Sequence, residues 1–179
     1  SGHKIHAPKG VGALYVGRGV RILPRAFGGE QQNRLRPGTE PAPLIAGLGA
    51  AIQALPDMEE ERKKIQAFKD YALGKLCQLP GVEVNSPKDA LPYVLNISAV
   101  GVRSETMLHH LAARGISVSS GSACAKGRQS HVLEAMGLAP ERIASAIRIS
   151  FSRYNTKEDI DQLAAGIKEG LEILARARV

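Results

Sequence analysis

The chain has 179 residues and a mass of 19.1 kDa, enough for one domain with a buried core or for a small domain with part of another. Hydrophobic residues make up 44% and charged residues 23%, which is ordinary globular usage and favours neither a disordered chain nor a coiled coil. The net charge of +7 comes from scattered Lys and Arg, and aromatic residues make up only 4%, so a basic surface that stacks nucleic-acid bases is not expected.

No stretch approaches the roughly 18 apolar residues of a membrane span, and the polar start lacks the apolar core of a signal peptide. The two cysteines, Cys77 and Cys124, follow no disulfide or zinc spacing, which favours a reducing compartment. We therefore expect a cytoplasmic protein with neither a membrane nor a nucleic acid as its partner.

Residues 1–55 are rich in Gly and Pro. The runs 11–16 and 20–23 predict two short strands between turn-forming residues. Residues 27–39 show no hydrophobic period, which predicts a long ordered loop or an arm that lies on another surface. Small and apolar residues over 43–55 predict a buried, closely packed helix.

From residue 56 onward the pattern is that of an α/β domain. A long helix with one apolar stripe is predicted from about residue 57 to 79. Ser104 is expected to cap the next helix and Gly115 to end it. This helix is predicted at residues 105–114. Strands are predicted before it at 82–84 and 93–98 and after it at 116–119 and 147–152.

The strand predicted at 147–152 alternates cleanly between apolar and polar side chains. The packed face is predicted to carry Ile147, Ile149 and Phe151. Arg148 belongs to the opposite, polar face. The last helix begins after Thr156, whose hydroxyl can cap it, and carries a long apolar stripe. Residues 56–179 therefore predict a complete small α/β domain.

Two polar segments carry candidate chemistry. Lys4 precedes the turn formed by residues 7–10, and a lysine amine attacks an aldehyde only when it is deprotonated. Cys124 follows a Ser/Gly-rich run and precedes basic residues, and nearby positive charge favours the reactive thiolate. From spacing alone, a solvated loop lysine and an unreactive cysteine remain the alternatives. Cys77, inside an apolar-patterned helix, is expected to be a core residue.

Arg148 is a candidate carboxylate clamp, because its planar guanidinium matches a carboxylate with two parallel hydrogen bonds. An ordinary surface arginine is the alternative. His109, His110, His131 and Cys124 show no recognised ligand spacing, so we expect no metal site.

Four motifs follow one another along nearly the whole chain. They are Ser1 to Lys4 with the segment up to Val16, Arg36-Pro37-Gly38-Thr39, Ser119 to Cys124, and Ile147 to Ser150. Together they resemble the cysteine desulfurases of the NifS/IscS branch, which are pyridoxal-phosphate (PLP) enzymes of fold type I in the aminotransferase class V group. The second motif has proline where that family usually has serine.

By this resemblance, Lys4 carries pyridoxal 5'-phosphate covalently in the intact enzyme, and Ser1 and His3 bind its phosphate. Thr39 then reaches the phosphate held by the other subunit of a homodimer, and Arg36 lies close to that junction. The cofactor and the homodimer partner are thus both implied by the first two motifs.

The last two motifs imply the substrate and the reaction. By the resemblance, Arg148 holds the carboxylate of L-cysteine, and the Cys124 thiolate takes up the substrate sulfur as a persulfide. Alanine is the product, and the sulfur passes to an acceptor protein.

The resemblance also implies that residues 1–55 are a remnant of the large PLP-binding domain and that residues 56–179 are the small C-terminal domain. The resemblance implies that family members have an N-terminal half that completes the cofactor cage, and we expect this chain to lack it. We therefore expect the C-terminal portion of a cysteine desulfurase, inactive alone. The alternatives are a selenocysteine lyase or cysteine-sulfinate desulfinase and, in a different class, a non-catalytic binding or dimerisation module.

Overall fold

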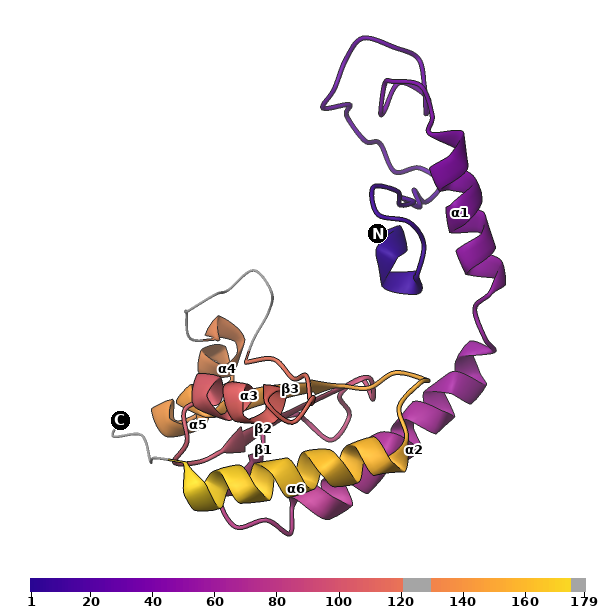
Figure 1. Cartoon of the computed structure of the whole chain (residues 1–179). Coiled ribbons are helices and arrows are strands. Elements are labelled where there is room, and N and C mark those ends of the chain that lie inside the picture. The colour runs from indigo at the N-terminus through magenta and orange to yellow at the C-terminus, as the bar shows by residue number, and fades with distance from the viewer. Residues whose placement is uncertain (121–129, 175–179) are drawn as a thin grey trace. The chain divides into compact units, whose positions relative to one another are not determined.

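The computed structural model describes residues 1–120 and 130–174 (Figure 1). The chain forms two compact units, Ser1–Met58 and Glu59–Val179. Each unit is described by itself below. The elements, in chain order, are the 3-10 helix η1 (Gly2–Ile5), α1 (Ala42–Gln53), α2 (Met58–Leu76), β1 (Val82–Val84), β2 (Val94–Ala99), α3 (Ser104–Ala112), α4 (His131–Ala135), α5 (Pro140–Ala144), β3 (Ala146–Ser150) and α6 (Lys157–Ile173).

The second unit is built on a three-stranded antiparallel sheet with the strand order β1-β2-β3. The predicted α/β class is confirmed, and the structure adds that the strands run antiparallel. Residues 116–119 were expected to form a fourth strand, but they pair only through a single bridge between Ser119 and Arg148. Two hydrogen bonds at one end are too few to make a strand of this segment.

One face of the sheet is apolar and packs against α2, α3 and α6 to form the main core. Leu95, Ile97 and Ile147 are fully buried on this face. Burial of each such side chain stabilises the fold by roughly 1.5–3 kcal/mol. Figure 1 shows α2 and α6 on the same side of the sheet, and the Tyr71 hydroxyl donates to Asp161 between the two helices at 2.9 Å.

The ends of two helices test the predicted caps. Thr156 begins α6 as expected, since its hydroxyl accepts from the Asp159 N–H at 3.2 Å. Gly115 follows α3 with a φ of 75°, which a glycine adopts readily. Ser104 is not a cap, because the extended backbone of Arg103 starts α3 one residue earlier than predicted.

The long helix α2 agrees with its prediction, but Cys77 does not. Its thiol is exposed just beyond the end of α2 rather than buried in the core. The buried stripe of α2 ends at Leu76, and the next residue along a helix lies about 100° further around the axis. Cys77 therefore points away from the core.

In the first unit, α1 forms where a helix was predicted, yet none of its residues is buried. Ile45 and Ile52 are 44% and 52% exposed. One side of α1 lies against the Pro8 turn, because a Cβ added at Gly47 would come within 2.7 Å of Pro8 Cγ. This turn is too small to cover the helix, so the predicted burial is wrong.

The strands expected at residues 11–16 and 20–23 are also absent from the first unit, all of which the structure describes. An extended segment needs a neighbouring strand for its backbone hydrogen bonds, and residues 1–58 supply none. Leu14, Tyr15 and Leu23 are accordingly exposed. Within the described residues, no helix is both long and apolar enough to cross a membrane.

Candidate cofactor and substrate site

Lys4 lies on η1, a turn whose backbone is fixed by close contacts. The Gly2 N–H donates to the Val11 carbonyl at 2.8 Å, and the Ala7 N–H donates to the Gly2 carbonyl at 3.1 Å. Gly2 is buried, and a Cβ there would come within 3.0 Å of both Ala7 Cβ and the Val11 oxygen. The turn therefore favours glycine at this position, while the Lys4 side chain is exposed.

Ser1, His3 and Lys4 all have exposed side chains on this one turn. A hydroxyl and an imidazole suit the oxygen atoms of a phosphate, and an amine suits an aldehyde. The chemistry of this donor set therefore fits PLP. In the described parts of the chain, no group of three or more His, Cys, Asp or Glu side chains could hold a metal ion.

Thr39 and Arg36 belong to a loop that is ordered by its own contacts. Residues 32–34 all have positive φ, between 52° and 65°, and so form a left-handed turn. The side-chain oxygen of Gln31 accepts from the Gly38 N–H at 3.1 Å, which ties the loop to the start of the Thr39 segment. Both Thr39 and Arg36 are exposed.

Arg148 lies in the middle of β3 and is half-buried on the polar face of the sheet, as predicted. Its backbone exchanges two hydrogen bonds with Ser119, at 2.6 and 3.1 Å. Its Nε atom is buried, and no group among the described residues accepts a hydrogen bond from it. A buried donor without an acceptor costs free energy, which a bound anion would relieve.

Cys124 lies outside the described residues, but both ends of its segment are described. The chain leaves the sheet at Ser119, whose backbone is hydrogen-bonded to that of Arg148. The described chain resumes at Ser130, whose hydroxyl caps α4 by accepting from the Leu133 N–H at 3.4 Å. The segment that carries the thiol therefore begins beside the candidate carboxylate clamp.

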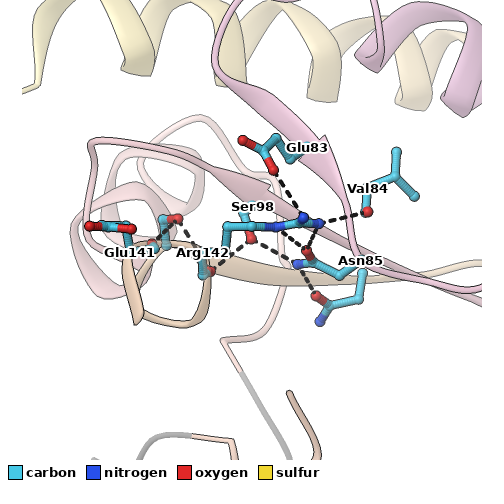
Figure 2. Close-up of polar contacts among 8 residues, drawn as sticks. Glu83, Val84, Asn85, Ser98, Glu141 and Arg142 are labelled. Atoms are coloured by element: carbon cyan, nitrogen blue, oxygen red, sulfur yellow. Dashed lines mark hydrogen bonds and ion pairs between the residues drawn. The ribbon is translucent and has the colours of Figure 1, made fainter. Parts of the chain in front are cut away.

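A polar network that the sequence analysis missed lies on the same face of the sheet. Arg142 of α5 donates to Asn85 Oδ1 at 2.6 and 3.1 Å and forms an ion pair with Glu83 at 3.0 Å (Figure 2). Asn85 Nδ2 in turn donates to Asn96 Oδ1 at 2.7 Å and to Ser98 Oγ at 2.8 Å. Arg142 and Asn85 are 57 positions apart, and no motif or period relates residues at such a separation.

The structure thus brings the predicted residues together in two groups. Ser1, His3 and Lys4 share one turn of the first unit. Arg148 and the start of the Cys124 segment share one edge of the sheet in the second unit.

Comparison with known proteins identifies the family. The model of the aminotransferase class-V family matches residues 1–163. The cysteine desulfurase NifS of Azotobacter vinelandii is 42% identical over 182 residues, which cover 99% of this chain and 44% of that protein. The cysteine desulfurase of Nostoc sp. is 44% identical over 179 residues, with 97% of this chain and 45% of that protein covered.

Solved structures agree with this assignment. A NifS-like protein superposes with a TM-score of 0.84 at 36% identity, covering 97% of this chain and 46% of that one. The NifS-like protein from Rickettsia africae has a TM-score of 0.74 at 32% identity and covers 86% of this chain and 41% of that one. The chain spans a little less than half the length of these relatives. It belongs to the aminotransferase class-V family, in which its relatives are cysteine desulfurases of the NifS/IscS branch.

Proposed function

We propose that the chain is the C-terminal portion of a PLP-dependent cysteine desulfurase, which converts L-cysteine to L-alanine and takes up the sulfur on Cys124. The observation that carries the proposal is the buried Nε of Arg148, which has no acceptor among the described residues. A substrate carboxylate would supply that acceptor. The backbone of Arg148 is also hydrogen-bonded to Ser119, where the Cys124 segment begins.

In this proposal the exposed side chains of the η1 turn hold the cofactor. Ser1 and His3 bind the phosphate, Lys4 Nζ is the point of attachment, and Thr39 binds the phosphate in the other subunit of a homodimer. Bound PLP supplies an electron sink for bond breaking at the substrate. The Lys4 amine would hold the cofactor aldehyde and, when free, would carry the α-proton of the substrate.

Cys124 performs the sulfur transfer. Its thiolate attacks the substrate sulfur, the bond between that sulfur and the β-carbon breaks, and a proton is returned to the β-carbon. The products are L-alanine and a persulfide on Cys124, so one sulfur atom moves and no outside oxidant or reductant is needed. A sulfur-acceptor protein then removes the outer sulfur.

The test is mass spectrometry of the chain after incubation with PLP and L-cysteine. We expect Cys124 to gain one sulfur atom only when a polypeptide supplies the rest of the length of the relatives, because the chain covers under half of it. The Cys124→Ser variant should gain none. The Cys77→Ser variant is the matched control and should load normally, since Cys77 lies just beyond the end of α2 and is not part of the segment that begins at Ser119.

Sulfur loading that persists in the Cys124→Ser variant would contradict the proposed role of Cys124. Turnover by the chain alone would contradict its proposed inactivity. Competition between L-cysteine, L-selenocysteine and L-cysteine sulfinate in the complemented protein decides between the desulfurase and the related lyase and desulfinase activities.

A further inference from the structure

The direction of every hydrogen bond around Arg142 is fixed by groups that have only one role. A guanidinium can only donate, so the Asn85 atom within 2.6 Å of it must be the side-chain oxygen. The Arg142 carbonyl can only accept, so Ser98 Oγ, at 2.7 Å, must donate to it. Asn85 is 94% buried and has no solvent to permit another arrangement.

These directions fix the amide of Asn96 as well. With its oxygen on Arg142, Asn85 turns its amide N–H groups toward Asn96 and Ser98, at 2.7 and 2.8 Å. The Asn96 atom that faces Asn85 must therefore be the oxygen. Asn96 Nδ2 is left with two N–H groups, and no described residue accepts from them.

Asn96 is also the direct cross-strand partner of Arg148. The two residues are paired in the register of β2 and β3, so their side chains project from the same face of the sheet. Cβ atoms of such partners lie about 4.5–5.5 Å apart, which is within reach of one small ligand. The two side chains that are neighbours on this face therefore each carry a donor, Asn96 Nδ2 and the buried Arg148 Nε, for which no described residue supplies an acceptor.

We propose that Asn96 Nδ2 is a second donor to the substrate carboxylate bound by Arg148, and that Arg142, acting through Asn85, is a positioning residue that keeps this N–H group turned outward. The inference rests on the proposed function, because it takes the Arg148 ligand to be a carboxylate. If Arg142 is removed, Asn85 is free to rotate its amide, and Asn96 can then present its oxygen to the anion instead.

The test is an NMR titration of the full chain, labelled with ¹⁵N, in which the Nε–Hε signal of Arg148 is followed. The probes are L-cysteine under reducing conditions and L-cysteine methyl ester, which lacks the carboxylate. We expect L-cysteine to shift the signal and the ester to leave it unchanged. The Asn96→Ala variant should bind L-cysteine about tenfold more weakly, as expected for one lost hydrogen bond to a charged group.

Asn96→Asp is nearly identical in shape and keeps the oxygen that faces Asn85, so the fold is retained while the donor is replaced by a negative charge. It should bind L-cysteine more weakly still. Arg142→Met should weaken binding several-fold, and Arg142→Lys should restore part of the loss, because the lysine ammonium can donate to Asn85 Oδ1. A role in stability alone would leave the affinity of the folded chain unchanged in both Arg142 variants.

The matched controls are Asn155→Ala and Arg114→Met, which remove an asparagine and an ion-paired arginine elsewhere in the same unit. They should leave the affinity unchanged. If the Asn96 variants bind L-cysteine as tightly as the parent chain, the inference is overturned and the proposed role of Arg148 stands. If Arg148 in the parent chain does not respond to L-cysteine, the inference is overturned, while sulfur loading of Cys124 in the complemented protein tests the proposed function separately.

Discussion

At the scale of single residues, Gly2 decides whether Lys4 is presented on an ordered turn. In a Gly2→Ala variant the new methyl group would lie 3.0 Å from both Ala7 Cβ and the Val11 oxygen. Such overpacking typically costs about 1–3 kcal/mol. We expect hydrogen exchange at the Ala7 amide, which bonds to the Gly2 carbonyl, to become at least about tenfold faster.

Gly49→Ala is the matched control for this variant. It adds the same methyl group to the first unit at a position in α1 where no atom lies within 4 Å. Exchange at Ala7 should not change in that variant. Unchanged exchange in Gly2→Ala would show that the η1 turn tolerates a side chain there.

Residues that act through short motifs could be predicted from the sequence, and residues that act through distant contacts could not. Arg148 was expected on a polar face because strand alternation is local, and the structure places it there. Arg142 and Asn85 meet only when α5 folds over the sheet, and each alone is an ordinary polar residue. Cys77 was misplaced because one position decides on which side of a helix a residue falls.

At the scale of elements, the start of α6 predicts a pH dependence of stability. The backbone N–H of Thr156, followed by the Asn155 amide, lowers the pKa of Asp159 below its ordinary value. A carboxyl whose pKa falls on folding stabilises the protein above its unfolded pKa, and this contribution is lost as the pH falls through the folded pKa. We therefore expect the difference in the free energy of unfolding between the parent chain and Asp159→Asn to shrink below about pH 4.

Urea unfolding across a pH series measures this difference. Glu158→Gln removes a neighbouring carboxylate from the same first turn of α6 but leaves the capping bonds in place. Its pH profile should follow that of the parent chain. An Asp159→Asn profile parallel to that of the parent chain down to pH 2 would contradict the role given to this carboxylate.

The elements of the second unit could be predicted because their partners lie within the same unit. β2, β3 and α6 each bury one face against the others, so periodicity and burial agree. In the first unit the patterns at residues 11–16 and 43–55 have no such partner. A pattern of side chains predicts which face would be buried, but only a second surface can bury it.

At the scale of the whole molecule, the first unit exposes several large apolar side chains to solvent. Leu14, Tyr15, Leu23 and Phe27 are 76% to 90% exposed. Exposed apolar surface of this kind promotes association, because burial of each large side chain contributes roughly 1.5–3 kcal/mol. We therefore predict that the chain self-associates as its concentration rises.

Sedimentation equilibrium of the full chain tests this. Replacing Leu14, Tyr15, Leu23 and Phe27 with serine should lower the association constant by more than about tenfold, since even part of their burial exceeds the 1.4 kcal/mol that a tenfold change requires. Leu91→Ser with Ile173→Ser is the matched control, because both residues are exposed on the second unit. A parent chain that stays monomeric would contradict the predicted self-association. If the control pair lowers the association constant as strongly, association does not arise from the apolar side chains of the first unit.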